Sequence, residues 1–337
     1  MNILITGGAG YIGSHCCLEL LNEGHDIVVI DNLSNSSYEA ISRVEKLAGK
    51  SIPFYKSDLR DKFQVEKIFK THPIDAVIHF AGLKAVGESV KNPINYYNNN
   101  NYSTLILLEV MSSFSCKKII FSSSATVYGD SNKSPIKENC KLSPNNPYGT
   151  SKLFIELMLG DIFLSDRSWD IVILRYFNPV GAHKSGQIGE NPNGTPNNLM
   201  PIIAQVAIGK RASLNIFGKN YDTHDGTGVR DYIHVVDLVS GHIKALAILN
   251  ELDEVVKINL GTGEGYSVLE VLEAFKSVSG RKIPYELTHP RSGDVAQSFA
   301  DVSLAKKILN WKAKSGLDDM CLDYWNFQLK NPKGYKK

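Results

Sequence analysis

The first thirteen residues constrain the fold of this chain more than any other segment. A short apolar run over residues 2–6 leads directly into a turn with glycines at Gly7, Gly10 and Gly13, and a helical pattern follows. Glycine permits a tight turn, a close approach of the backbone to a pyrophosphate and close packing of a helix against a strand. The N–H groups and positive dipole at the start of the helix then attract phosphate. The segment therefore predicts a strand, a phosphate-binding turn and a helix.

An acidic residue at the end of the next strand identifies the expected cofactor. The apolar run over residues 26–30 ends on Asp31, and an acid about 20 residues past such a turn is the usual partner of an adenosine ribose. A carboxylate there repels the 2′-phosphate of NADP, so the sequence favours NAD. The competing interpretation is a strand, a turn and a capped helix without a ligand.

Strands and helices alternate through the first half of the chain, which predicts a parallel sheet covered on both faces. We expect an α/β fold with a Rossmann-type doubly wound sheet, in which ligands bind at the carboxyl ends of the strands. The expected strands are residues 2–6, 26–30, 52–56, 75–80, 118–122 and 170–175. The expected helices are residues 12–23, 37–48, 62–70, 94–112 and 148–164.

The second half differs in character, because residues 185–201 are rich in Gly, Pro and Asn, as loops are. We expect a dinucleotide-binding domain over residues 1–178 and a smaller C-terminal substrate-binding domain over residues 179–337. A segment near residues 231–260 is expected to return to the first domain. The elements expected in this half are helices at 199–208 and 267–279, a strand–helix pair over 231–248 and a strand at 255–260.

Charge and composition point away from several classes of protein. The net charge is only +2 and no Lys/Arg cluster alternates with aromatic residues, so we expect no nucleic-acid partner. The cysteines form no CxxC pair and the histidines show no ligand spacing, so we expect reduced thiols and no metal. No apolar run approaches the length of a membrane span, and a strand starting at residue 2 leaves no room for a signal peptide. We therefore expect a cytoplasmic protein.

The strongest catalytic signal is Tyr148 followed four residues later by Lys152, since this spacing puts both side chains on one face of a helix. A tyrosine of normal pKa is a poor base at neutral pH. A nearby ammonium favours the phenolate and lowers that pKa. We expect Lys152 to supply this charge, and Ser124, at the end of the strand at 118–122, to share a hydrogen bond.

These residues together resemble the extended short-chain dehydrogenase/reductase family. The resemblance is carried by the glycine turn, by Ser124 and by the pair Tyr148 and Lys152. Longer stretches are similar, within that family, to enzymes that invert C4 of UDP-hexoses. These stretches are residues 79–89, 121–129, 174–182, 197–201 and 225–234.

The resemblance implies a set of ligand-binding residues in addition to the catalytic Tyr148, Lys152 and Ser124. Those implied for NAD, besides the three glycines and the catalytic pair, are Tyr11, Ile12, Asp31, Asn32, Asn35, Asp58, Leu59, Phe80, Ala81, Lys84, Asn99, Ser122 and Phe177. Those implied for a UDP-sugar, besides Ser124 and Tyr148, are Lys84, Asn178, Asn197, Asn198, Leu199, Asn215, Phe217, Arg230, Arg291, Asp294 and Ser298.

The resemblance also implies a reaction and an assembly. Tyr148 would remove the proton of the sugar 4-hydroxyl, NAD would take the C4 hydride and return it to the opposite face, and a 4-keto sugar would lie between. Helices at 94–112 and 148–164 would form the interface of a homodimer. Serine at position 298, where some relatives have tyrosine, would leave room for an N-acetyl group and admit N-acetylated UDP-hexoses.

Three other functions remain open. Related dehydratases and decarboxylases place acidic residues directly after the strand-end Ser or Thr, whereas this chain has Ala125 and Thr126 there. A dehydrogenase using free NAD would not need the two diphosphate arginines. A catalytically silent NAD-sensing protein would not need Tyr148 and Lys152.

Overall fold

The computed structural model describes residues 1–130, 132–194, 196, 198–250, 252–290 and 294–335. Backbone contacts divide the chain into two units, each described by itself below. The first unit takes residues 1–129, 142–175 and 239–258, and the second takes 130–141, 176–238 and 259–337. In the structure the segment that returns to the first unit is thus 239–258, and residues 130–141 join the second.

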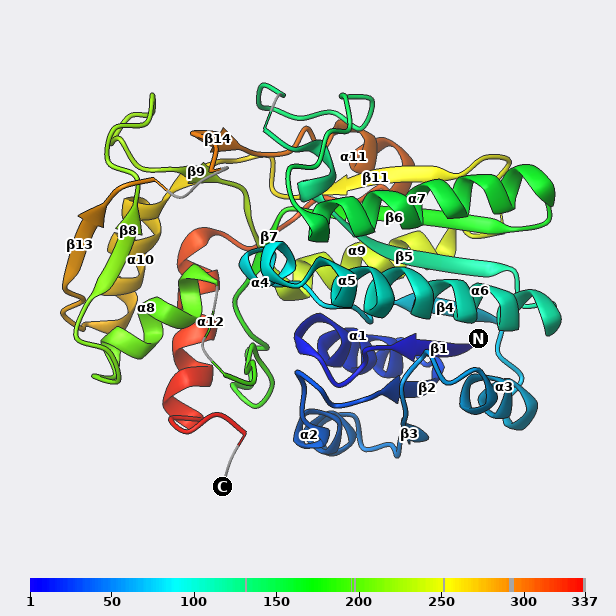
Figure 1. Cartoon of the computed structure of the whole chain (residues 1–337). Coiled ribbons are helices and arrows are strands. Elements are labelled where there is room, and N and C mark those ends of the chain that lie inside the picture. The colour runs from blue at the N-terminus through cyan, green and yellow to red at the C-terminus, as the bar shows by residue number, and fades with distance from the viewer. Residues whose placement is uncertain (131, 195, 197, 251, 291–293, 336–337) are drawn as a thin grey trace. The chain divides into compact units, whose positions relative to one another are not determined.

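A seven-stranded sheet in the order β11-β6-β5-β4-β1-β2-β3 forms the centre of the first unit (Figure 1). β1 pairs in parallel with β2 and β4, and the pairs β2–β3 and β4–β5 are also parallel. The strand order reverses between β1 and β4, which makes this point the switch point of a doubly wound sheet. The predicted Rossmann-type α/β fold is therefore confirmed. The strands are β1 (Asn2–Thr6), β2 (Asp26–Asp31), β3 (Phe54–Lys56), β4 (Ala76–His79), β5 (Lys118–Ser124), β6 (Asp170–Tyr176) and β11 (Val256–Leu260).

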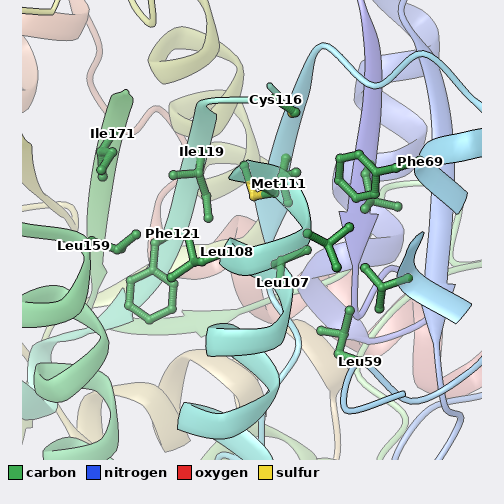
Figure 2. Close-up of a cluster of buried hydrophobic side chains, with 14 of the residues drawn as sticks. Leu59, Phe69, Leu107, Leu108, Met111, Cys116, Ile119, Phe121, Leu159 and Ile171 are labelled. Carbon is green, nitrogen blue, oxygen red and sulfur yellow. The ribbon is translucent and has the colours of Figure 1, made fainter. Parts of the chain in front are cut away.

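Three helices cover one face of this sheet: α3 (Lys62–Thr71), α6 (Ser103–Ser113) and α7 (Pro147–Ser165). Their apolar side chains meet those of the strands in a single buried cluster, in which Met111 of α6 and Leu159 of α7 lie over Phe121 and Ile119 of β5 (Figure 2). Burial of this cluster fixes the helices on the sheet, and with them the loops at the carboxyl ends of the strands.

The opposite face is covered by helices that include α1 (Tyr11–Asn22), α2 (Tyr38–Ala48) and α9 (Val235–Ala247), and α1 and α9 lie behind the sheet in Figure 1. Gly8 lets α1 approach closely, because a Cβ there would lie 2.7 Å from Cγ1 of Val29 and 3.3 Å from Sγ of Cys17. With both faces covered, the inner strands of the sheet are buried along almost their whole length, whereas the edge strand β3 is only partly buried.

The prediction of a single helix over residues 94–112 is wrong in the middle of that range. The structure has α4 (Val86–Lys91), α5 (Pro93–Tyr96) and then a π-helix, η1 (Tyr97–Tyr102), before α6 begins. Four consecutive asparagines, Asn98–Asn101, have low helix propensity. The amide of Asn100 bonds to other segments of the chain, so tertiary contacts rather than helical periodicity decide the backbone here.

The second unit consists of small sheets and three longer helices. The expected helices at 199–208 and 267–279 are confirmed as α8 and α10, and the strand–helix pair expected over 231–248 is confirmed as β10 followed by α9. The other short strands and the elements after residue 280 were not predicted. Strands of two to four residues show too little alternation to be recognised. The elements are β7 (Asn178–Val180), α8 (Leu199–Ala207), β8 (Leu214–Phe217), β9 (Val229–Arg230), β10 (Tyr232–His234), β12 (Tyr266–Ser267), α10 (Val268–Ser279), β13 (Tyr285–Thr288), β14 (Gln297–Ser298), α11 (Ser303–Leu309) and α12 (Leu317–Lys330).

A separate core joins α8, α10 and α12 of the second unit. The rings of Phe275 in α10 and Trp325 in α12 meet edge to face with centroids 5.8 Å apart. α10 starts in a capping box between Ser267 and Glu270. Among the helices of the described residues, none is both long and apolar enough to cross a membrane.

Candidate functional site

The glycine-rich turn joins β1 to α1 beside the switch point of the sheet. Gly7 has φ +69°, and a Cβ on it would lie 2.8 Å from the Ala81 nitrogen. A Cβ on Gly13 would lie 2.3 Å from the Gly7 carbonyl oxygen. Gly10 caps α1 without a side-chain hydrogen bond, and the first turn of α1, which starts with Tyr11 and Ile12, has no acidic residue. The turn thus presents backbone N–H groups to an anion, as the pyrophosphate of NAD requires.

Asp31, the last residue of β2, ties this turn to the strand. Its Oδ2 accepts from the Ala9 N–H at 3.0 Å, and its Oδ1 accepts from the Leu33 N–H and the Ser36 hydroxyl, both at 2.8 Å. A carboxylate has about four acceptor positions, so these three bonds leave one for a ribose hydroxyl. The predicted residue Asn35 lies in the loop between β2 and α2.

A second carboxylate lies at the end of β3. Asp58 accepts two hydrogen bonds from the Arg60 guanidinium, at 2.8 and 2.9 Å, one from the Arg60 backbone N–H at 2.9 Å and one from Asn32 at 2.9 Å. The hydrogen bonds from Arg60 hold the pKa of Asp58 well below its usual range. The loops after β2 and β3 are thereby joined, with the buried Leu59 beneath them. This arrangement suits the adenine end of the predicted cofactor.

The loop after β4 lies at the switch point next to the glycine turn. The Ala81 N–H donates to Oγ1 of Thr6 at 3.2 Å, which fixes the start of the loop to β1. Phe80 packs against the ring of His242 with centroids 5.0 Å apart. Lys84 follows in the same loop, and its charge reaches the phenol of Tyr148.

Ser124, the last residue of β5, lies close enough to Tyr148 to lower the pKa of its phenol. Oγ of Ser124 accepts from both the N–H and the hydroxyl of Thr126, at 3.2 and 3.0 Å, in the short 3₁₀-helix η2 (Ala125–Tyr128). With both acceptor positions used, the Ser124 hydroxyl keeps its proton available for a further partner such as Tyr148. Tyr148 lies in the first turn of α7, where the helix dipole also favours an anion. Burial raises the pKa of Tyr148, while the Ser124 hydrogen bond and the charge of Lys84 lower it.

Lys152 lies one helical turn after Tyr148, and its side chain extends to the end of β5. Its Nζ donates to the carbonyl of Ser122 at 2.8 Å and lies 4.9 Å from the ring centroid of Phe121. Burial lowers the pKa of Lys152 to about 8, against the opposing charge of Glu156. A buried ammonium needs an acceptor, and the end of β5 supplies one. The charge of Lys84 lowers the pKa of Tyr148, and the contribution of Lys152 to that phenol stays a prediction.

In the second unit, Asn178 and Arg230 are placed by one buried carboxylate. Asp231 accepts from the N–H and hydroxyl of Thr262, both at 2.8 Å, and from the N–H groups of Gly263 and Ala300 at 3.0 and 3.1 Å. The Asp231 carbonyl accepts from both the backbone and the side-chain amide of Asn178, at 3.0 and 2.9 Å. Asp231 thus holds the strand ends on which the predicted substrate residues lie.

The structure brings Arg230 and Ser298 together. They are register partners in the sheet β12-β9-β14, where β9 and β14 are parallel, and Tyr266 flanks Arg230 on the other side. Register partners project to the same face of a sheet. A guanidinium suited to phosphate and a small hydroxyl residue therefore lie side by side.

The other residues predicted for the UDP-sugar are distributed over the second unit. Asn198 donates to Glu190 at 2.6 Å, and Leu199 begins α8. Asn215 and Phe217 share the exposed face of β8. Phe177, predicted for NAD, is buried and donates its N–H to the Leu260 carbonyl. Asp294 is partly buried, and Asn197 and Arg291 lie outside the described residues.

Four features of these sites were not recognised from the sequence. Thr126 donates to the Ser124 hydroxyl, Lys84 lowers the pKa of Tyr148, and Asp231 holds the strand of Arg230. The buried asparagine of η1 is Asn100, whereas Asn99 is only partly buried. Thr126 and Asp231 lie within the stretches that carry the resemblance. The hydrogen bonds of Thr126 are local, to Ser124, whereas those of Asp231 depend on distant segments.

A glycine turn at the switch point of a doubly wound sheet, with serine, tyrosine and lysine at the end of β5, defines a nucleotide-binding α/β fold of the short-chain dehydrogenase/reductase type. The chain matches the family model described as GDP-mannose 4,6 dehydratase over residues 4–324. It is 57% identical over 336 residues to a UDP-glucose 4-epimerase of Bacillus subtilis (strain 168), with 100% of this chain and 99% of that protein covered.

Solved structures agree with this relationship. A crystal structure of UDP-glucose 4-epimerase from Bifidobacterium longum in complex with NAD+ and UDP is 53% identical with a TM-score of 0.95, and covers 99% of this chain and 100% of that one. The structure of the UDP-Glc/GlcNAc 4-epimerase from Campylobacter jejuni is 40% identical with a TM-score of 0.85, with 98% and 99% covered. The chain belongs to the UDP-glucose 4-epimerase family of the extended short-chain dehydrogenase/reductases.

Proposed function

We propose that this protein is an NAD-dependent isomerase that interconverts UDP-glucose and UDP-galactose by inverting C4 of the sugar. The observation that carries the proposal is the placement of Ser124 at the end of β5 and of Tyr148 in the first turn of α7, with Lys152 bonded to the Ser122 carbonyl, at the carboxyl edge of the sheet that also carries the glycine turn. A phenol so placed suits proton removal from a secondary hydroxyl. The B. subtilis relative with the same name at 57% identity supports the same reaction.

NAD is the cofactor that the first unit fits. The glycine turn leaves no room for Cβ atoms, and Asp31 retains one acceptor position for a ribose hydroxyl. When bound, NAD supplies the acceptor and the returning donor of the C4 hydride, so the sugar passes through a 4-keto intermediate. Since no net oxidation results, we expect the cofactor to stay bound through the cycle.

Tyr148 is the proposed base. As a phenolate it takes the proton of the sugar 4-hydroxyl, and it returns that proton when the sugar is reduced again. Ser124 donates to the phenolate oxygen, and the Lys84 charge stabilises it. Lys152, bonded to the Ser122 carbonyl, serves the end of β5 and the predicted cofactor ribose.

We assign the UDP moiety to the second unit, with Arg230 on the diphosphate and Asn178, Asn198, Leu199, Asn215 and Phe217 around the nucleotide sugar. Guanidinium donors match phosphate oxygens in geometry and charge. Arg291 and Asn197 belong to the same assignment by sequence. Ser298, adjacent to Arg230 in the sheet, is assigned to the wall of the sugar pocket.

A small residue at position 298 supports activity on N-acetylated UDP-hexoses as well. Serine leaves space where a tyrosine would crowd the C2 substituent of the sugar. The C. jejuni structure, a UDP-Glc/GlcNAc 4-epimerase, demonstrates that such breadth occurs among proteins similar to this chain. We propose that the chain shares it.

Dehydration is the alternative that the family model suggests by its description. Eliminating water requires an acid and a base beside the sugar. The positions after Ser124 are Ala125 and Thr126, and the hydroxyl of Thr126 already donates to Ser124. This arrangement favours epimerisation over dehydration.

We also propose a homodimer in the cytoplasm. Large apolar side chains are exposed on α5, α6 and α7, and Phe154 of α7 lies close to Tyr97 of η1, with ring centroids 6.1 Å apart. A second copy of the chain would cover such a surface. All five cysteines are free thiols, as expected in a reducing compartment.

The direct test is product analysis with UDP-glucose and UDP-N-acetylglucosamine supplied separately to the purified protein without added NAD. The proposal expects the C4 epimer from both, and a transient absorbance near 340 nm that returns to baseline. A 4-keto-6-deoxy product would favour dehydration. A requirement for free NAD with net oxidation would favour a dehydrogenase, and the absence of any product would favour an NAD-sensing protein.

A further inference from the structure

The first unit buries an ion pair between α7 and β6. The side chains of Glu156 in α7 and Arg175 in β6 are 2% and 1% exposed. The guanidinium pairs with both carboxylate oxygens, since its Nε donates to Oε1 at 3.0 Å and its Nη2 donates to Oε2 at 2.6 Å. A fork of this kind fixes the distance and the angle between its two partners. The pair therefore joins α7 to β6 in one defined geometry.

Two further segments of the first unit bond to this pair. The Ser123 hydroxyl of β5 donates to Oε1 of Glu156. Nη1 of Arg175 donates to the Tyr128 hydroxyl of η2 at 2.9 Å, and the guanidinium carbon lies 5.0 Å from the centroid of the Tyr128 ring. All four side chains are buried. The resulting network connects β5, η2, α7 and β6.

On α7 the network continues the row of proposed catalytic groups. Glu156 follows Lys152 by four residues and Tyr148 by eight, which places the three side chains on one face of the helix. Their bonds to β5 also follow one another, because Lys152 donates to the Ser122 carbonyl and Glu156 accepts from the neighbouring Ser123. The position of α7 along β5 is thus fixed at two successive residues of the strand.

The short helix η2 is held by the same network. It starts directly after Ser124 and contains Thr126, which donates to the Ser124 hydroxyl at 3.0 Å. Its last residue is Tyr128, which accepts from Arg175. The turn that occupies the acceptor positions of Ser124 is therefore anchored at its far end by the buried ion pair.

Stability alone does not account for burying these two charges. Ions that leave water lose hydration that their mutual attraction hardly repays, and an apolar pair of similar volume is often at least as stable. The apolar side chains of α7, such as Ile155 and Leu159, already hold the helix on the sheet, but apolar contacts are non-directional. What the ion pair adds is direction, because a satisfied polar network specifies one arrangement of the segments that it joins.

We propose that Glu156 and Arg175 are positioning residues of the epimerase reaction, which set α7 and η2 against the end of β5 so that the proposed catalytic side chains keep one geometry. The inference rests on the proposed function. It assigns neither residue a contact with substrate or cofactor, because the carboxylate and the guanidinium are buried and bonded to each other.

Replacing both charges by apolar side chains separates positioning from stability. The combined change Glu156→Leu and Arg175→Met should keep the melting temperature close to that of the wild type, because no buried charge is left unpaired. The kcat for UDP-glucose should fall about 10- to 100-fold, as small displacements of reacting groups cause. KM should change little, because the UDP moiety is assigned to the second unit. An ion pair that served stability alone would show the reverse, a lower melting temperature with kcat retained.

An ion pair at the other ends of the same two elements provides the matched control. Lys117, directly before β5, lies 2.7 Å from a carboxylate oxygen of Asp166, directly after α7. These ends of β5 and α7 lie away from the carboxyl edge of the sheet, where Ser124 and Tyr148 are. Lys117→Met should therefore retain kcat and KM. An equal loss of kcat in this variant would overturn the proposal.

Hydrogen exchange provides a readout that does not depend on turnover. In the double variant the amides of residues 124–129 and 147–153 should exchange faster than in the wild type, and in Lys117→Met they should not. Near-wild-type kcat in the double variant, or unchanged exchange in either segment, would overturn the proposal.

If the double variant does not fold, Arg175→Lys undergoes the same measurements with the same expected results, because lysine keeps the charge but lacks the planar fork. Wild-type kcat or exchange in that variant would likewise overturn the proposal. A wild-type protein without epimerase activity contradicts the proposed function, while the exchange result still decides whether the ion pair holds α7 and η2.

Discussion

At the scale of single residues, the proposed site depends on hydroxyl groups whose proton positions are set by their neighbours. Thr126 occupies the acceptor positions of Ser124, so the Ser124 proton remains available to Tyr148. The phenol also lies in the first turn of α7 and within reach of the Lys84 charge. These three influences oppose the effect of burial on the pKa of Tyr148.

Tyr148→Phe should keep the fold and the bound cofactor but lower kcat by roughly 10²–10⁴-fold, the usual contribution of a positioned base. The ring remains, so packing hardly changes, while the proton acceptor is lost. Turnover is measured by product analysis, and melting temperature and NAD content serve as controls. Near-normal turnover would exclude Tyr148 as the base.

Ser298→Tyr should abolish the reaction of UDP-N-acetylglucosamine and spare that of UDP-glucose, because the added ring would occupy the space of the N-acetyl group. The measurement is the ratio of kcat/KM for the two substrates. Ser298→Ala, which adds no bulk, should leave the ratio unchanged. If the tyrosine variant treats both substrates alike, Ser298 is not a pocket residue.

At the scale of elements, one buried histidine joins β1, β4 and α6. Oγ1 of Thr104 donates to the Asn100 carbonyl at 2.6 Å, so it accepts from Nε2–H of His79 at 2.9 Å. Nδ1 of His79 then accepts from Oγ1 of Thr6 at 2.6 Å. Both ring nitrogens are used by a neutral imidazole, and burial lowers the pKa of His79 to about 3.

This pKa predicts acid sensitivity. Between the ordinary value of 6.5 and about 3, the unfolded chain binds a proton at His79 that the folded chain excludes. The free energy of unfolding should therefore fall on acidification below pH 6.5, by up to about 1.4 kcal/mol per pH unit from this residue. Urea unfolding between pH 6.5 and 4 gives the dependence of the unfolding free energy on pH. In His79→Asn this dependence should be weaker than in the wild type by the equivalent of one bound proton. Equal slopes would mean that His79 is charged in the fold.

In the second unit, the buried carboxylate of Asp231 joins several segments, as His79 does in the first. It connects the Arg230 strand to residues 262, 263 and 300. Asp231→Asn sets an amide donor against backbone N–H groups, so we expect a loss of about 3 kcal/mol in the free energy of unfolding. Asp253→Asn, at an exposed position, should change it by less than about 0.5 kcal/mol. Similar values for the two variants in urea unfolding would contradict this role.

At the scale of the whole molecule, the proposed assembly depends on apolar side chains that the monomer leaves in solvent. Ile94 of α5 is 83% exposed, Leu105 of α6 is 50% exposed, and Leu157 and Leu164 of α7 are 55% and 66% exposed. Leu157 and Leu164 are seven residues apart and so lie on one side of α7. Contiguous apolar surface of this kind is typical of protein interfaces.

The combined change Leu105→Glu and Leu157→Glu should convert a dimer to a monomer, because charge on this surface is costly to bury. Sedimentation equilibrium at micromolar concentration is the measurement. Leu329→Glu, at an equally exposed leucine of α12, is the matched control and should leave the dimer intact. A wild-type protein that sediments as a monomer would contradict the proposed assembly.

The sequence by itself determined the alternating elements of the first unit, the glycine turn with its acid, and the positions of Tyr148 and Lys152. These are local properties, because periodicity, glycine geometry and helical spacing act over a few residues. Only the tertiary structure decided that the Lys152 ammonium bonds to the Ser122 carbonyl, that η1 interrupts a helix, and that Ser298 lies beside Arg230. Each depends on contacts between segments far apart in the chain, where burial and hydrogen-bond satisfaction outweigh local preference.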